Sequence, residues 1–377
     1  MSSEVSEKAE EKGRGLTFFE RYLTVWVILC IAAGTLIGWG LPGFAEAIDY
    51  EIRDVNVPIA VLLFLMIYPI MVQIEFSEIV NATKRPKPVL LTLIVNWAIK
   101  PFTMAFWGWL FMVHIWSPWL EMEVAYGYMA GMILLGIAPC TAMVLVWSYL
   151  AEGNMGYTLI MVAINSLSML FLYAPLGVLL LGLVGVPGVV EMTAGVGEAI
   201  PLGYLAFSVG VYIGLPLVAG YITRHSLITL KSRQWFEETF LPKLDNVATV
   251  ALLLTLTFIF TMEAEEIVRL PLNIVMIAIP LLLQTFSIFI IAYLAAKLLG
   301  VVYEDAAPAS MIGASNHFEV ALAVAIMLFG AGSPAALAAV VGVLIEVPAM
   351  LFLVRICLST RGYFESNPEL AASSAAG

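Results

Sequence analysis

Long apolar stretches, rather than alternating hydrophobic and polar positions, dominate the sequence. Ten of them reach the roughly 20 apolar residues that a helix needs to cross a bilayer. They cover residues 22–42, 56–74, 88–113, 125–150, 156–182, 201–223, 242–262, 270–298, 306–330 and 334–357. Mostly short segments separate them, which leaves no room for a soluble domain. The pattern predicts an all-α polytopic membrane protein with ten transmembrane helices, numbered below as spans 1 to 10.

Composition narrows the function further. Of 377 residues, 62% are hydrophobic and only 12% are charged, about half the charged share of a typical soluble protein. A soluble enzyme is therefore excluded, and a net charge of −11 argues against nucleic acid as a partner. The sequence has no GxxxxGK[ST] loop for a nucleotide, so energy is expected from an ion gradient, and we expect no cofactor.

The basic residues predict the orientation. Fourteen of the 17 fall in the N-terminal segment, in the loops after spans 2, 6 and 8, and at the C-terminal end. Arg53 and Arg269 fall on the opposite side, and Lys100 lies within span 3. Because cytoplasmic loops are enriched in Lys and Arg, both termini are expected to be cytoplasmic. The protein itself is expected in the cell membrane. Residues 1–20 lack the apolar run of a signal peptide, so span 1 is expected to stay in the membrane.

An internal match predicts two inverted halves. Residues 136–142 of span 4 align without a gap on residues 313–319 of span 9, and Gly153 then falls on Gly330. Span 4 is the fourth helix of the first five, and span 9 is the fourth helix of the second five. Because five is an odd number, the second set enters the membrane from the opposite side, which makes it an inverted repeat. The expected organisation is a cytoplasmic N-terminal tail (1–21), a first five-helix repeat (22–182), an extracellular linker (183–200), a second repeat (201–357) and a cytoplasmic C-terminal tail (358–377).

Both matched segments are poor helix formers. Pro139 lacks a backbone N–H, Cys140 and Thr141 follow it, and Ser315-Asn316-His317 places polar residues at mid-membrane depth. Paired breaks in corresponding helices are a pointer to a transporter binding site. The alternative is that Pro139 only kinks span 4.

At these residues the sequence resembles the arsenical-resistance-3 arsenite efflux permeases, within the bile acid/arsenite/riboflavin transporter superfamily. The resemblance covers the chain from Glu20 to about Arg355. The segments that carry it are residues 20–27, 96–104, 136–144 and 315–319.

The resemblance implies a ten-helix fold in which spans 1, 2, 6 and 7 form a panel. Spans 3–5 and 8–10 would form a core with broken, crossing helices 4 and 9. It also implies export of trivalent arsenic, and sometimes antimony, as an uncharged hydroxide against a proton. The family's functional cysteine and glutamate map onto Cys140 and Glu319. His317 stands where a Phe is expected, and Ala323 replaces a Gln of the sodium-coupled relatives, which puts sodium coupling in doubt.

Cys140 and Glu319 are the main candidates, with Thr141 and Asn316 as further substrate-binding residues. A thiolate is the soft ligand that As(III) prefers, so we expect Cys140 to bind the arsenic of As(OH)3. The alternative is a small buried residue, which is our interpretation of Cys30 and Cys357. An ionisable group at membrane depth is costly, so Glu319 is expected to carry the coupling proton. It also lies three residues after Asn316, which is the spacing of a helix capping box.

Several polar residues inside the spans are expected to support the site. They are Asn96, Lys100, Ser315, His317 and Glu346. Lys100 and Glu346 either pair with each other or serve proton and substrate access. For His317 we favour a hydrogen bond to the broken backbone over a proton relay, and Asn96, Asn165 and Gln284 are expected to bridge helices. The external Glu263, Glu265 and Glu266 are interpreted as solvated surface.

Two other functions remain as alternatives. A sodium-coupled symporter of organic anions would share the fold. An intramembrane hydrolase would need a catalytic constellation, but no Asp lies deep in a span and no GxSxG motif with a His is present. Secondary export of arsenite by alternating access, which the resemblance implies, is the predicted function, with the proton and the lipid bilayer as partners.

Overall fold

A computed structural model describes residues 23–48, 50–52, 55–74, 86–141, 143–186, 202–269, 271–330 and 332–365. Apart from a two-stranded hairpin of β1 (Glu51–Ile52) and β2 (Val55–Asn56), the regular structure of these residues is helical. The predicted tail 1–21, most of the linker 183–200 and the end of the C-terminal tail lie outside the described residues.

Within the described ranges, six helices are long and apolar enough to cross a membrane. They are Pro86–Ile115, Met155–Leu183, Leu205–Leu230, Arg233–Met262, Pro271–Leu298 and Pro334–Ser359. Four shorter apolar helices accompany them, at Ile28–Gly40, Val57–Gln73, Met122–Ile137 and Phe318–Phe329. Each predicted span overlaps one of these helices, several of which extend beyond the predicted bounds.

One group of helices is joined through α5 (Val57–Gln73), which packs against both α14 (Leu215–Leu230) and α16 (Leu241–Met262), while α16 in turn packs against α3 (Leu23–Gly40). The group also contains α13 (Leu202–Val209) and the π-helical turn η4 (Gly210–Gly214). Helix α3 lies very close to α16 because Gly34 and Gly38 have no side chains. A Cβ atom on Gly38 would lie 2.1 Å from the carbonyl oxygen of Thr261. Small residues four apart allow this backbone approach between membrane helices.

The second group surrounds two helices that break midway. It contains α7 (Pro86–Ile94), η2 (Val95–Ile99), α8 (Lys100–Gly108), η3 (Trp109–Ile115), α9 (Met122–Ile137), α10 (Met143–Leu150), α11 (Met155–Leu183), α18 (Pro271–Leu298), α19 (Tyr303–Ala314), α20 (Phe318–Phe329) and α21 (Pro334–Ser359). Helix α21 packs against both α9 and α20, while α18 packs against α19 and α8. These are the helices that the resemblance assigned to a core, and they hold most of the fully buried side chains.

Local sequence signals set several helix starts. Asn56 caps α5 by accepting a hydrogen bond from the Ile59 amide at 3.0 Å. Asn154 caps α11 in the same way through the Tyr157 amide at 3.0 Å. Ser333 caps α21 through the Ala336 amide at 3.2 Å, with Pro334 in the first turn.

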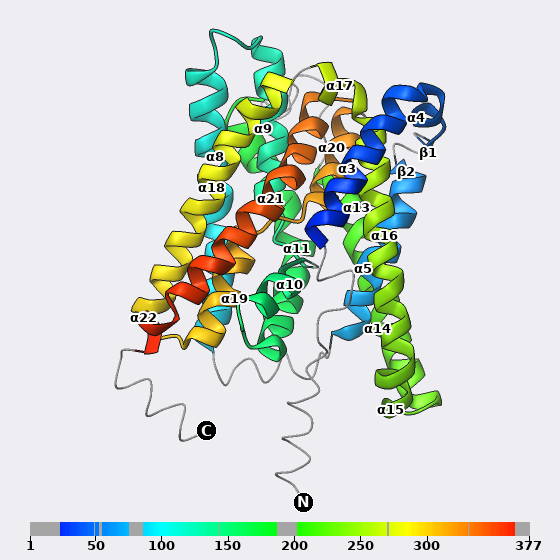
Figure 1. Cartoon of the computed structure of the whole chain (residues 1–377), viewed down its shortest axis with the longest axis vertical. Helices are drawn as coiled ribbons and strands as arrows, with labels where there is room; N and C mark the ends of the chain where they lie inside the picture. The colour runs from blue at the N-terminus through cyan, green and yellow to red at the C-terminus, as the bar shows by residue number, and fades with distance from the viewer. Residues whose placement is uncertain are drawn as a thin grey trace, which may run out of the picture.

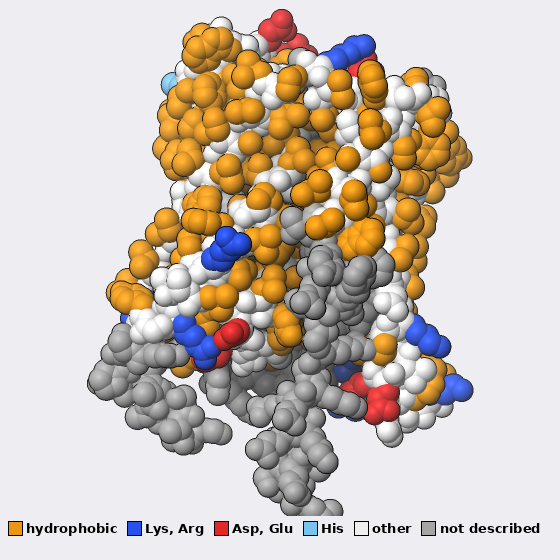
Figure 2. All heavy atoms as spheres, viewed as in Figure 1, with side chains coloured by type: hydrophobic (Ala, Val, Ile, Leu, Met, Phe, Trp, Pro, Cys, Tyr) orange, Lys and Arg blue, Asp and Glu red, His pale blue; other side chains and the backbone are white. Residues whose placement is uncertain are grey.

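The two ends of the molecule differ in their short elements. Helices α15 (Arg233–Trp235) and α22 (Arg361–Glu365) lie at one end, and α4 (Pro42–Ile48) and α17 (Ala264–Arg269) lie at the other (Figure 1). On the face shown in Figure 2, hydrophobic side chains cover most of the surface between these ends, with charged side chains mostly toward them. This surface suits a lipid environment over the height of the helices.

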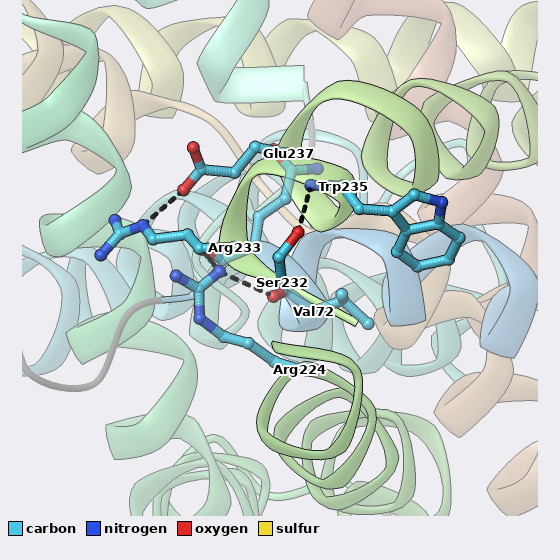
Figure 3. A network of polar contacts seen from close by, with 7 residues as sticks. Val72, Arg224, Ser232, Arg233, Trp235 and Glu237 are labelled. Atoms are coloured by element: carbon cyan, nitrogen blue, oxygen red, sulfur yellow. Dashed lines mark hydrogen bonds and ion pairs between the residues drawn. The ribbon is translucent and has the colours of Figure 1, made fainter. Parts of the chain in front are cut away.

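A polar corner follows α14 at the α15 end. Ser232 accepts a hydrogen bond from the Trp235 amide at 3.1 Å, and Arg233 Nε lies 2.7 Å from Glu237 Oε1 in η5 (Phe236–Phe240) (Figure 3). Arg224 Nη1 donates to the Val72 carbonyl at 3.4 Å, near the end of α5 (Figure 3). Cations are favourable at helix C-termini, so Arg224 ties α14 to α5.

Residues 361–365 of the predicted C-terminal tail form α22 rather than a free tail. Its Phe364 is buried and packs against Tyr293 and Tyr303. Arg361 Nη1 lies 2.5 Å from Glu152 Oε2, in the turn after α10. Helix α22 therefore connects the ends of α18, α19 and α10.

Candidate functional site

The two broken helices meet at their breaks. Helix α9 ends at Ile137 and α10 begins at Met143, while α19 ends at Ala314 and α20 begins at Phe318. Pro139 and Asn316 form an isolated antiparallel bridge, and the His317 amide donates to the Ala138 carbonyl at 2.9 Å. The bridge satisfies part of the backbone that the breaks leave unpaired.

Cys140 lies in the first break, next to the bridge. Its side chain is only 4% exposed, and its thiol lies beside the Ser315 hydroxyl and the Val144 amide. Glu346 and Glu319 are the carboxylates whose charges act on it. The other two cysteines are in unbroken helices: Cys30 is in α3 and Cys357 is near the end of α21. The crossing therefore places one thiol among two carboxylates.

Glu319 contacts His317 rather than capping a helix. The Oε2 atom of Glu319 lies 2.9 Å from Nδ1 of His317, and both side chains are almost fully buried. The capping-box interpretation is not supported, because α20 begins at Phe318 with His317 as its N-cap and has no side-chain cap. The expected side-chain hydrogen bond from His317 to the broken backbone is also replaced: its backbone amide makes that bond, and its ring faces Glu319.

Lys100 and Glu346 meet through Ser315. Lys100 Nζ donates to the Ser315 carbonyl at 2.5 Å, and Glu346 Oε1 accepts from the Ser315 hydroxyl. The same Oε1 atom accepts from the Asn316 amide at 3.2 Å. Among the ion pairs of the described residues none includes Lys100, so the predicted Lys100–Glu346 pair is indirect.

Unpartnered polar atoms gather at the same crossing. Within the described part of the chain, five buried atoms there make no hydrogen bond: Thr141 Oγ1, Asn316 Oδ1, both ring nitrogens of His317, and Glu346 Oε2, although His317 Nδ1 lies 2.9 Å from Glu319. Buried polar atoms normally have partners, and an orphaned group calls for an explanation. A small ligand with hydroxyl groups would supply hydrogen bonds to such atoms.

Asn96 lies apart from this cluster. Its Nδ2 atom donates to Oδ1 of Asn165 in α11 at 2.8 Å, which confirms the expected bridge between helices. Gln284 in α18 is fully buried, yet neither of its amide atoms has a hydrogen-bond partner in the described residues, so its expected bridge is absent there. No group of three or more His, Cys, Asp or Glu residues that could hold a metal ion occurs in the described ranges.

The expectation that Glu263 is solvated is wrong. Its neighbour Glu265 is exposed and pairs with Arg269, as a solvated surface residue does. Glu263 itself is only 1% exposed and accepts a hydrogen bond from the Gly332 amide at 3.1 Å. It therefore connects the end of α16 to the turn between α20 and α21. Its place at the end of an apolar span gave no signal of this burial.

Comparison with known proteins decides the family. The Arsenical-resistance protein Acr3 of Alkaliphilus metalliredigens is 47% identical over 97% of this chain and 99% of its own length. The protein of the same name from Corynebacterium glutamicum is 33% identical over 93% of this chain and 91% of its own. The chain belongs to the Acr3 arsenical-resistance family.

The wider comparisons agree with this membership. Residues 60–270 match the Sodium Bile acid symporter family, the superfamily that contains Acr3. An uncharacterized transporter of Synechocystis sp. is 51% identical over 98% of this chain and 96% of its own length. This Acr3-family chain is thus a multi-pass membrane transporter and not an enzyme.

Proposed function

We propose that the protein exports trivalent arsenic from the cytoplasm as uncharged As(OH)3, and that antimonite is a second substrate. The observation that carries the proposal is the Cys140 thiol, buried where two broken helices meet, at a crossing that also holds Glu319 and Glu346. Membership of a family whose curated relatives are named for arsenical resistance supports the same substrate. A thiolate is a soft ligand that As(III) prefers, and a single thiolate binds it reversibly, as a transporter requires.

The proposed substrate also fits the polar atoms around the thiol. As(OH)3 carries hydroxyl groups that donate and accept hydrogen bonds. Thr141 Oγ1 and Asn316 Oδ1 are buried acceptors without partners in the described structure. Glu319 takes the coupling proton in this proposal, and Nδ1 of the adjacent His317 ring lies 2.9 Å from its carboxylate.

Alternating access is the proposed mechanism, with both termini in the cytoplasm and the two five-helix halves inverted. The bridge between Pro139 and Asn316 supports the repeat, because 177 residues separate these two positions, which is the offset of the sequence match. Helix α20 packs against α5 and α13 of the first helix group. Moving the broken helices relative to that group would open the site to each side in turn.

The second candidate is a sodium-coupled symporter of organic anions. The match to the Sodium Bile acid symporter family favours it, and Ala323 in place of a Gln counts against it. The two candidates differ in cation dependence. Arsenite transport that persists without sodium and collapses with a protonophore supports the proton antiporter, and strict sodium dependence supports the symporter.

The test is arsenite uptake by everted membrane vesicles from cells that lack their own exporter. Cys140→Ser and Glu319→Gln are expected to lose uptake, because one removes the soft ligand and the other removes the titratable group. Cys30→Ser and Cys357→Ser are matched controls and should keep uptake. Normal uptake by Cys140→Ser would remove the thiol from the mechanism.

A further inference from the structure

Lys100 is fully buried beside the break between α19 and α20. It directly follows the π-helical turn η2, and its backbone amide donates to the Val95 carbonyl, five residues earlier. Pro101 follows and cannot donate a backbone hydrogen bond. Such π-turns insert an extra residue into a helix and often mark functional positions. From this turn the Lys100 side chain reaches the break after α19.

The Ser315 carbonyl, which binds the ammonium, lies at a half-helix end. Ser315 is the C-cap of α19, and its own amide donates to the Met311 carbonyl. Carbonyls at a helix C-terminus carry partial negative charge and lack partners within the helix. In transporters with broken helices, such half-helix ends and unwound carbonyls coordinate the coupling cation. The Lys100 ammonium occupies this kind of position.

Glu346 holds the same peptide from the other side. Glu346 binds the hydroxyl of Ser315 and the amide of Asn316. Glu346 and Cys140 are the ionisable groups whose charges act on Lys100. The peptide at Ser315 is thus held between an ammonium and a carboxylate. A buried ammonium is costly unless it is compensated, and here the compensation is the hydrogen bond to the Ser315 carbonyl, with Glu346 on the other side of the same peptide.

We propose that the Lys100 ammonium is a tethered cation that takes the place of a dissociable alkali cation at the crossing. The inference rests on the proposed function. It explains how a chain that matches a sodium symporter family would work without sodium: the positive charge needed beside the broken helices is part of the chain. Glu319 and His317 remain available for the coupling proton, because Lys100 contacts neither in the described structure.

Removal of the tether gives the test. In vesicles with choline as the only added cation, Lys100→Ala is expected to lose arsenite uptake about tenfold or more, because the Ser315 carbonyl and the nearby Glu346 carboxylate lose a buried positive charge. Sodium should restore a substantial part of that uptake by entering the vacated space. Lys100→Met fills the space with an uncharged chain and should stay inactive in both salts. Wild-type uptake should be the same in choline and sodium.

Stability gives a second readout that needs no ion gradient. A cation that binds only the folded Lys100→Ala protein should raise its melting temperature. Sodium or methylammonium should therefore stabilise purified Lys100→Ala relative to choline, and neither should stabilise the wild type or Lys100→Met. If Lys100→Ala folds only when purified with methylammonium, the proposal holds.

The result that would overturn the tethered-cation proposal differs from the result that would overturn the proposed function. If the wild type transports arsenite but Lys100→Ala gains neither uptake nor stability from small cations, Lys100 is not a substitute cation and the proposed function stands. A Lys100→Ala protein that stays unfolded with and without methylammonium overturns the tethered cation in the same way. If the wild type does not transport arsenite in any salt, the proposed function itself fails.

Discussion

Pro139 and Asn316 pair through their backbones where α9–α10 and α19–α20 break. The pairing does not use the adjoining side chains, because the contact is made by main-chain atoms. It also means that the break in each helix is stabilised by the break in the other. A change that restores helix on one side should therefore disturb both.

Pro139→Ala tests this dependence. Alanine is the strongest helix former, so the substitution favours a continuous helix through residues 138–140 and competes with the bridge. We expect most arsenite uptake to be lost while the protein stays folded. Pro175→Ala, within α11, is the control and should keep uptake. Full uptake by Pro139→Ala would show that the break does not depend on this proline.

The close contact between α3 and α16 predicts a position-specific effect on stability. A Cβ at Gly38 would meet the Thr261 carbonyl at 2.1 Å, whereas a Cβ at Gly40 meets nothing within 4 Å. Gly38→Ala should lower stability by about 1–3 kcal/mol through overpacking. Gly40→Ala should leave the melting temperature in detergent unchanged or raise it, since alanine favours helix. Equal melting temperatures for the two variants would contradict the packing.

The buried hydrogen bond between Glu263 and the Gly332 amide predicts that two substitutions of Glu263 differ in stability. Glu263→Ala leaves the Gly332 amide without this acceptor, at a cost of about 1–3 kcal/mol. Glu263→Gln keeps an acceptor oxygen and should cost less. Melting temperatures of the two variants, with the exposed Glu265→Gln as reference, check the order. The interpretation fails if Glu263→Ala melts at the wild-type temperature.

Glu152 is the one residue other than glycine with a positive φ among the described residues, at 55°. That conformation costs an ordinary residue roughly 1–2 kcal/mol, and the exposed ion pair with Arg361 contributes about 1 kcal/mol or less. Glu152→Gly should therefore leave stability unchanged or raise it. Glu304→Gln, which weakens the longer contact of the same Arg361, is the control. A clear fall in melting temperature for Glu152→Gly would show that the ion pair dominates.

The sequence predicted the features that follow from short stretches of chain. Apolar runs located the membrane helices, and Pro139 with the polar run at Ser315 located the breaks. It could not reveal that Lys100 binds a carbonyl, that His317 faces Glu319, or that Glu263 is buried. These contacts depend on how separate elements pack, so only the folded chain as a whole decides them. The π-helical turn before Lys100 likewise has no sequence signal beyond Pro101.

The contact between Lys100 and Ser315 has a consequence for biogenesis. The two residues are 215 positions apart, and a ribosome needs roughly ten to forty seconds to synthesise that length. During that time the ammonium of span 3 has entered the bilayer without its acceptor, at a cost of about 2.5–3.5 kcal/mol on the insertion scale. The first half of the chain therefore reaches its final packing only after Ser315 and Glu346 have been translated, and a truncated chain would expose this charge to membrane quality control.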